Sequence, residues 1–224
     1  PVENYSDDIS SVILKRANHS DVFLSRDKKK LLDFDHSLRI GTSSLRRKAQ
    51  LLNINTALKI DDIRGNVDTR ISKMLDGEYD GLVMAAAGLE RLGLEDYITE
   101  YFDTDQMLPA PGQGAISVEF KKKNNELFDI LKNINDNETD LCTYYERSFM
   151  NELGGGCNSP IGAYSFISDK KKIITGSILS LDGSQVYKHS LEEDISNDVN
   201  IGKLLAEKLI NSGANKIIKN LNIE

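Results

Sequence analysis

An apolar strand that ends in a short polar loop and continues into a helix occurs three times in succession, and this plan restricts the fold more than any other feature. The three strands end at Gly41, near Arg64 and at about Ala87, and an amphipathic stretch follows each of them. Strands that alternate with helices assemble into largely parallel sheets covered by helices. The first part of the chain is therefore predicted to be an α/β domain.

Capping residues and the spacing of apolar side chains set the expected bounds and faces of the helices. Ser43 or Ser44 is expected to cap a helix that runs to about Leu52, and Asn66 is expected to cap the next one. A third helix is expected to begin after a break at Gly88. The core-facing side chains predicted for the later helices, including a closing helix over residues 197–212, are Val67, Ile71, Leu75, Leu89, Leu92, Val199, Leu204, Leu205 and Leu209.

The second half of the chain has a different pattern. Residues 107–120 contain the stretch APGQGA, which is typical of a hinge and, less specifically, of a phosphate-binding turn. A long amphipathic helix from Asn137 or Thr139 stops at GGGCNSP, and Asp182-Gly183 marks a hairpin. This order predicts a small α+β domain with a three-stranded sheet. Its strands are expected at residues 161–168, 172–181 and 184–191.

Composition and charge exclude several classes of function. Lys+Arg number 28 against 35 Asp+Glu, a formal net charge of -7, which argues against a sequence-independent nucleic-acid-binding surface. No apolar run approaches the roughly 20 residues of a membrane span, and no signal-peptide pattern follows Pro1. The two cysteines lack the spacing of a zinc site. We therefore expect a soluble, intracellular protein with two reduced thiols, no metal, and neither a membrane nor a nucleic-acid partner.

Arginine occurs at each of the three junctions between strand and helix. In sheets of this kind ligands bind beyond the carboxyl ends of the strands, so the arginines are expected to meet in one cleft. A guanidinium binds a carboxylate or phosphate through two parallel hydrogen bonds, and a helix N terminus adds donors. The pattern favours a ligand with several carboxylates; the alternative is that each arginine forms a surface salt bridge. The residues concerned are Arg46, Arg47, Arg64, Arg70 and Arg91.

The glycine loop displays a cysteine. Three glycines precede Cys157 and leave space around its thiol, which suits covalent attachment or nucleophilic attack. The alternative is a buried, inert cysteine in a tight turn. Cys142 lies within a predicted helix and is expected to be structural. The histidines are expected to be solvated at the surface, so no histidine base is predicted; they are His19, His36 and His189.

Five motifs together resemble one enzyme family. They are GTSSLRRKAQL, IRGNVDTRI, GEYDGLVMAAAGLERLGL, LPAPGQGAISVE and GGGCNSPIGAY, and they cover almost the whole chain in the family's order and spacing. On these motifs the chain resembles the hydroxymethylbilane synthases, also called porphobilinogen deaminases. The resemblance implies a transferase of tetrapyrrole and haem biosynthesis that condenses four porphobilinogen molecules, with release of ammonia, into hydroxymethylbilane. It implies a location in the cytoplasm or in an organelle such as a plastid.

The resemblance also implies roles for residues around a dipyrromethane cofactor. The cofactor is expected to be attached covalently, through a thioether, to Cys157. The residues expected to bind the cofactor are Ser44, Arg46, Arg47, Arg64, Gly65, Asn66 and Arg70. The residues expected to bind porphobilinogen and the growing polypyrrole are Arg64, Arg70, Arg91, Gln113 and Gly114. Arg46 and Arg47 are thus expected to clamp the carboxylates of the cofactor.

The resemblance divides the chain into parts of a three-domain enzyme. Residues 1–108 match the second domain, which resembles periplasmic binding proteins, and residues 136–224 match the C-terminal domain with the cofactor cysteine. Residues 109–135 form a hinge and return to a first domain, most of which is expected to precede Pro1. The family's catalytic aspartate, in a Lys-Asp-x-Pro motif, is expected there, because this sequence has no Lys-Asp dipeptide.

Three expectations follow from this division. The 224 residues alone are expected to be inactive, although the complete enzyme is expected to be a monomer. Apolar positions at Ile116, Val118, Leu127 and Ile130 are expected to be exposed, with disorder, aggregation or association with a complementing partner such as the N-terminal segment as the result. Two other functions remain open: a non-catalytic module that binds polycarboxylates, and a hydrolase with a cysteine nucleophile, for which no histidine lies near Cys157 in the sequence.

Overall fold

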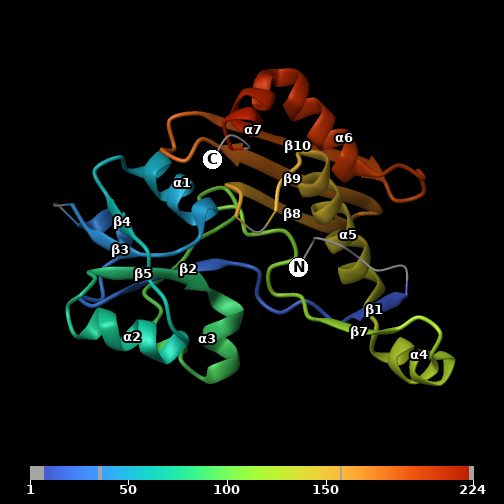
Figure 1. Cartoon of the computed structure of the whole chain (residues 1–224), viewed down its shortest axis with the longest axis horizontal. Coiled ribbons are helices and arrows are strands. Elements are labelled where there is room, and N and C mark those ends of the chain that lie inside the picture. Colours follow the sequence, from blue (N-terminus) through green and yellow to red (C-terminus); the bar gives the residue numbers. More distant parts are fainter. Residues whose placement is uncertain (1–7, 35–36, 157, 222–224) are drawn as a thin grey trace.

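The computed structural model describes residues 8–34, 37–156 and 158–221. It contains a five-stranded sheet with helices on both faces, a three-stranded sheet with helices on one side, and a separate pair of strands (Figure 1). No helix within these ranges is long and apolar enough to cross a membrane.

The five-stranded sheet has the order β4-β3-β5-β2-β6. Its central strand β3 is parallel to β4 and β5, whereas β2 is antiparallel to both of its neighbours. The predicted α/β class, a mostly parallel sheet covered by helices, is confirmed, and β2 is the exception to the parallel direction. The strands are β2 Asp21–Ser25, β3 Arg39–Gly41, β4 Lys59–Asp61, β5 Gly81–Ala85 and β6 Glu100–Tyr101.

The strands of this sheet carry apolar side chains on both faces, because helices cover both. Helix α1 (Leu45–Ile54) lies on one face, and α2 (Val67–Leu75) and α3 (Ala86–Leu92) lie on the other (Figure 1). Neighbouring residues of a strand point to opposite faces. Phe23 accordingly packs in the cluster with Leu51 of α1, while its neighbours join the cluster with α2 and α3.

The predicted faces of three helices were wrong at single positions. Leu75 and Leu92 are 50% and 54% exposed, and Met74 is buried in place of Leu75. Helix α3 begins at Ala86, directly after β5 and before Gly88, so its apolar stripe is rotated from the one expected. In the closing helix α6 (Ile201–Leu209) the buried positions are spaced by four residues, which leaves the neighbouring apolar side chains exposed. The buried residues of that stripe are Ile201, Leu205 and Leu209, whereas Leu204 is exposed. Val199, which was predicted in this helix, is also exposed and lies before its N-cap Asn200.

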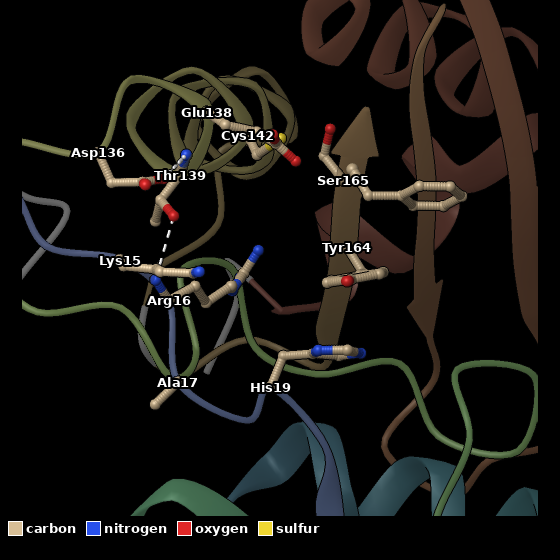
Figure 2. Close-up of a pocket in the computed structure, with 11 residues that line it drawn as sticks. Lys15, Arg16, Ala17, His19, Asp136, Glu138, Thr139, Cys142, Tyr164 and Ser165 are labelled. Carbon is tan, nitrogen blue, oxygen red and sulfur yellow. Dashed lines mark hydrogen bonds between the residues drawn. The ribbon is translucent and has the colours of Figure 1, made fainter. Parts of the chain in front are cut away.

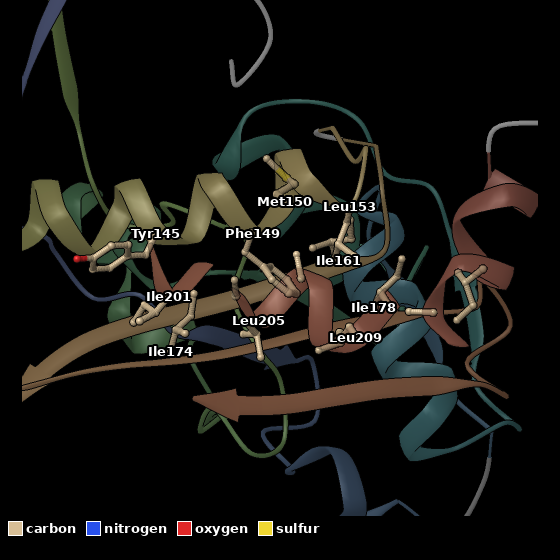
Figure 3. Packing of buried hydrophobic residues seen from close by; sticks show 14 residues of the cluster. Tyr145, Phe149, Met150, Leu153, Ile161, Ile174, Ile178, Ile201, Leu205 and Leu209 are labelled. Carbon is tan, nitrogen blue, oxygen red and sulfur yellow. The ribbon is translucent and has the colours of Figure 1, made fainter. Parts of the chain in front are cut away.

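The predicted α+β unit in the second half of the chain is confirmed. Its sheet has the antiparallel order β10-β9-β8, and α5 and α6 pack on it around Phe149, which is fully buried (Figure 3). The Asp182-Gly183 hairpin joins β9 and β10 as predicted. The elements are α5 Asn137–Glu152, β8 Ile161–Ser168, β9 Lys171–Leu179, β10 Val186–Asp194, α6 Ile201–Leu209 and α7 Asn215–Leu221.

A pair of strands lies apart from both larger sheets. Strand β1 (Ile9–Ile13) is antiparallel to β7 (Ser117–Lys121), and the short helix α4 (Asn125–Leu131) follows β7. Ile116 and Ile130 beside this pair are 41% and 63% exposed, whereas the other two apolar positions expected there are partly buried. Residues 9–13 are thus paired with the returning segment instead of the five-stranded sheet, and the division at residues 108 and 135 stays a prediction.

The hairpin of the C-terminal unit touches the helix that carries the arginine pair. Gly183 has φ +73, and a Cβ there would lie 2.5 Å from the backbone nitrogen of Asn53 in α1. The Asn53 side-chain amide donates to the Gly183 carbonyl at 3.0 Å. Only a glycine allows this approach of two backbones, so the contact fixes α1 against the C-terminal unit.

Candidate functional site: an arginine cluster at the carboxyl edge of the sheet

The carboxyl ends of the three parallel strands meet at one edge of the five-stranded sheet. Helix α1 begins there after β3, with Ser44 as its N-cap, and α3 begins there after β5. Because β2 runs antiparallel to β5, its first residue, Asp21, lies opposite Ala85, the last residue of β5. A carboxylate is thereby placed at the same edge as the arginines.

Asp21 accepts hydrogen bonds from both arginines of α1. Arg46 Nη1 lies 2.5 Å from Asp21 Oδ2, and Arg47 Nε lies 2.8 Å from Asp21 Oδ1. Arg46 also donates to the Leu108 carbonyl at 2.6 Å. Asp21 is fully buried, and the Arg46 and Arg47 side chains are 3% and 13% exposed. The anion that compensates the two cations at this helix start is therefore an internal carboxylate.

The charges of the cluster do not cancel. Burial alone would raise the pKa of the Asp21 carboxyl, but the charges of Arg46 and Arg47 outweigh it and lower that pKa. Burial lowers the pKa of Arg47, and the charges of Arg46 and Arg70 lower it further against the opposing effect of Asp21. One carboxylate thus compensates two guanidinium groups, with a third arginine close enough to act on them.

Gln113 of the loop over residues 109–115 completes the cluster. Its amide nitrogen donates to the His19 carbonyl at 2.7 Å and to Asp21 Oδ1 at 3.1 Å. Its amide oxygen accepts from Arg46 Nη2 at 3.3 Å and from Arg47 Nη2 at 3.5 Å. The neighbouring Gly114 has φ +84, and a Cβ there would lie 2.8 Å from the backbone oxygens of residues 17 and 18. The loop is therefore held tightly against the segment that leads into β2.

The other predicted arginines lie farther from Asp21. Arg70 donates to the Gly65 carbonyl at 2.7 Å, which holds its side chain over the loop before α2. Asn66 is the N-cap of α2, but its side chain makes no capping hydrogen bond. Arg64 and Arg91 are exposed and form no side-chain hydrogen bond or ion pair within the described ranges. The structure brings Arg46, Arg47 and Gln113 together and leaves Arg64 and Arg91 facing solvent.

Of the two cysteines, only Cys142 lies within the described residues. Cys157, the predicted attachment point, lies outside the described residues. Cys142 is buried in α5, and burial raises the pKa of its thiol to about 11. This thiol stays protonated near neutral pH and is a poor nucleophile, in agreement with the structural role predicted for it.

A second buried carboxylate, Glu146 of α5, lies across the loop from Asp21. Both of its oxygens accept from Arg16, each at 2.7 Å, and backbone N–H groups of Gly112 and Ser165 donate to it at 2.7 and 2.8 Å. Arg16 also donates to the Gln113 carbonyl at 2.9 Å. Glu146 thus ties α5, β8 and the loop to the segment between β1 and β2.

A pocket of about 430 Å³ adjoins this ion pair, between the segment over residues 15–19, α5 and β8 (Figure 2). His19 stacks on Tyr164 with ring centroids 3.8 Å apart, and the Arg16 guanidinium lies 5.2 Å from the same ring. His19 is therefore partly buried against Tyr164 and not fully solvated at the surface as predicted, while His36 lies outside the described residues. Burial and the charge of Arg16 lower the pKa of His19.

The sequence did not reveal that Asp21 and Glu146 are buried carboxylates paired with arginine, or that His19 is partly buried. Asp21 opens an apolar strand and would be placed at the site only by knowing that β2 is antiparallel. Glu146 lies between Tyr145 and Phe149, two residues on the buried face of α5. A charged residue so close to this face was the signal that the sequence offered. A charged residue among core positions is buried only when it is paired.

The cluster can bind a ligand that carries more than one carboxylate. Two guanidinium groups share one internal anion, a third lies nearby, and the exposed Arg64 lies at the neighbouring junction before α2. Arg91 is also exposed, but it lies in the last turn of α3 and not at the junction where it was predicted. Charge-assisted bonds of this kind are strong and directional, especially away from water. The chemistry of the donors fits a polycarboxylate.

Comparison with known proteins agrees with this site. Residues 2–129 match the family model of the porphobilinogen deaminase dipyromethane cofactor binding domain, and residues 140–211 match the model of its C-terminal domain. The chain is 41% identical over 211 residues to porphobilinogen deaminase of Desulforamulus reducens, covering 94% of this chain and 68% of that protein. It is 38% identical over 224 residues to that of Alkaliphilus metalliredigens, covering 100% of this chain and 71% of that protein. The chain belongs to the porphobilinogen deaminase family.

Proposed function

We propose that this chain supplies the cofactor-binding and substrate-binding residues of a hydroxymethylbilane synthase, the transferase that joins four porphobilinogen molecules head to tail and releases one ammonia at each addition. Each porphobilinogen carries two carboxylates, so the growing product is a polyanion. The observation that carries the proposal is the cationic excess at the carboxyl edge of the sheet, where Arg46 and Arg47 share the single carboxylate of Asp21. The family assignment supplies the chemical identity of the polyanion.

The residues present fit a dipyrromethane cofactor. Its acidic side chains need several cationic donors away from bulk water, and Arg47 and Arg70 supply them at the start of α1 and α2. When bound, the cofactor supplies the terminal pyrrole from which the product grows. We propose Cys157 as its attachment point, on the sequence pattern alone, because this residue lies outside the described ranges.

The proposed roles of the remaining residues follow from their positions. Ser44 caps α1 and orients its first turn, since its hydroxyl accepts from the Arg47 backbone N–H at 3.4 Å. Gly65 holds the Arg70 side chain through its carbonyl, and Asn66 begins α2 beside it. We propose that the exposed arginines and the hinge loop bind porphobilinogen and the elongating chain. These residues are Arg64, Arg70, Arg91, Gln113 and Gly114.

The condensation also needs a carboxylate that these residues do not provide. Loss of ammonia from porphobilinogen places positive charge on a pyrrole nitrogen, and a fixed carboxylate beside it lowers the barrier. Arginine has the wrong charge for this task, and Asp21 is fully buried and already bound by two guanidinium groups. The sequence contains no Lys-Asp dipeptide, the pair that the resemblance associates with the catalytic acid. We therefore propose that these 224 residues, assayed alone, do not form hydroxymethylbilane.

The test is an assay with porphobilinogen of the holoenzyme, meaning these 224 residues together with the polypeptide that supplies the catalytic carboxylate and with the cofactor bound. It is read by tetrapyrrole formation and by the intact mass of the protein. We expect a pyrrole adduct that is absent from the Cys157→Ser variant. We expect Arg47→Met to lower kcat/KM by about a hundredfold, the cost of a misplaced substrate. A protein that binds pyrrole carboxylates but gains no adduct and forms no product would instead be the non-catalytic polycarboxylate module. A cytoplasmic location and a monomeric state stay predictions.

A further inference from the structure

We infer that Asp21 is a positioning residue for the ligand-binding arginine: it fixes the Arg47 guanidinium so that one edge faces the ligand, with Arg46 and Gln113 as its supports. This inference rests on the proposed function. Asp21 itself does not touch the substrate, because its side chain is fully enclosed by the groups that bind it.

The two arginines use their donors differently. Both Nη atoms of Arg46 are bound, to Asp21, Gln113 and the carbonyl of Leu108, and its Nε is buried with no partner among the described residues. Arg46 is therefore enclosed on every side, with 3% of its side chain exposed. A residue in this position can hold its neighbours in place, but it has no free edge with which to bind the carboxylate of a ligand.

Arg47, unlike Arg46, keeps one edge of its guanidinium group only weakly bound. Asp21 Oδ1 lies 2.8 Å from both Nε and Nη2 of Arg47, so it occupies the side of the guanidinium. The contacts at the end of the group are long: Nη1 lies 3.3 Å from the Val83 carbonyl and Nη2 lies 3.5 Å from Gln113 Oε1. Contacts of this length are weak hydrogen bonds. A ligand carboxylate can replace both of them with a bidentate pair, while Asp21 keeps its hold on the side.

Charge and geometry predict opposite results when Asp21 is neutralised. Asp21→Asn raises the positive charge of the cluster by one unit, so attraction alone would strengthen the binding of an anion. It also removes the ionised acceptor that holds both guanidinium groups, so Arg46 and Arg47 repel each other without restraint. If position matters more than charge, ligand binding becomes weaker although the site has become more cationic.

The test compares three variants of the holoenzyme: Asp21→Asn, Gln113→Leu and Lys172→Met. Lys172 is 2% exposed and donates to backbone carbonyls of residues 197 and 199 in the C-terminal unit, so its variant matches the loss of a buried charged group far from the cluster. Each variant is checked for folding by circular dichroism. The fraction of molecules with a pyrrole adduct and the KM for porphobilinogen are then measured.

We expect Asp21→Asn to raise KM by about tenfold or more and to lower the adduct fraction, as misplacement of a binding group does. Gln113→Leu keeps all charges and should give a smaller loss in the same direction. Because Gln113 is itself proposed to contact the ligand, a fourth variant, Asp21→Glu, carries the test if Asp21→Asn does not fold: it keeps the charge but displaces the carboxylate, and it should also raise KM. Lys172→Met should keep the wild-type KM once it is assayed well below its melting temperature. Unchanged or tighter binding by a folded Asp21→Asn variant overturns the inference, as does an equal loss in Lys172→Met.

The inference and the proposed function can fail separately. If Arg47→Met also keeps the wild-type KM and adduct fraction, the proposed role of the arginine cluster is wrong. If Arg47→Met loses both while Asp21→Asn and Gln113→Leu keep them, Arg47 binds the ligand without needing Asp21, and only the positioning role is wrong.

Discussion

Two fully buried carboxylates, Asp21 and Glu146, contact the same hinge loop but bind arginine in different ratios. Glu146 pairs with one guanidinium, that of Arg16, and its oxygens also accept two backbone N–H bonds. Asp21 accepts hydrogen bonds from two guanidinium groups, and in the part of the chain that the structure describes one donor nitrogen of Arg46, Nε, has no partner. The balanced pair joins parts of the fold, whereas the unbalanced cluster keeps positive charge available for an anion. The ratio of charges therefore distinguishes a structural ion pair from a binding site.

The largest difference in stability is expected when one arginine is removed from each buried carboxylate, Arg16 from Glu146 and Arg47 from Asp21. Arg16→Met leaves Glu146 buried with no cation, which should cost about 3–5 kcal/mol of unfolding free energy. Arg47→Met leaves Asp21 still paired with Arg46 and relieves repulsion between cations, so its cost should be about 1 kcal/mol, ordinary for a point substitution. Urea unfolding of the two variants measures both costs. Equal losses would remove the distinction between the two carboxylates.

A smaller effect is expected in acid, where Asp21 takes up a proton. Its pKa is lowered in the folded protein, so the stability that it adds is fully present above the ordinary carboxyl pKa of about 3.9 and is lost as the pH falls through the lower folded value. The difference in unfolding free energy between the wild type and Asp21→Asn should be constant from pH 7 to about pH 5 and should shrink below about pH 4. A difference that stays constant into strong acid would show that the Asp21 charge is not stabilised by the arginines.

The smallest effect is expected at His19, beside the balanced pair. Its folded pKa is lowered by burial and by Arg16, while Asp21 opposes the shift. The unfolded chain therefore binds a proton at a higher pH, and stability should fall as the pH drops below about 6.5. His19→Phe keeps an aromatic ring to stack on Tyr164 but cannot be protonated, so this slope should become flatter. An identical slope in wild type and variant, measured by urea unfolding between pH 7 and pH 5, would contradict the assignment.

The sequence predicted the elements of this fold better than their directions and exact faces. The alternation of strands and helices placed α1 and α2 after β3 and β4, and the Asp182-Gly183 pair placed the hairpin. Local patterns carry these features. Leu92 was assigned to the core because α3 begins before Gly88 and not after it. Leu75 is the last residue of α2, whose N-cap is the predicted one, and Met74 is buried in its place; which of two adjacent apolar residues is buried depends on tertiary packing.

The arginines of the site were predicted from the sequence, but the carboxylate that pairs with them was not. Arg46 and Arg47 are adjacent in the sequence and lie at a predicted helix start, so their position could be derived. Asp21 is 25 residues from Arg46, and only the antiparallel pairing of β2 with β5 brings it to the carboxyl edge. The same holds for Glu146, which is 130 residues from Arg16. Long-range pairing of charges leaves no periodic signal in a single sequence.

The most direct test of the unbalanced cluster is a crystal structure of the holoenzyme. We predict that both Nη atoms of Arg47 lie within hydrogen-bond distance of one pyrrole carboxylate while Arg46 remains bound to Asp21. A structure in which Arg46 leaves Asp21 to bind the ligand, or in which no ligand carboxylate reaches Arg47, would contradict this account.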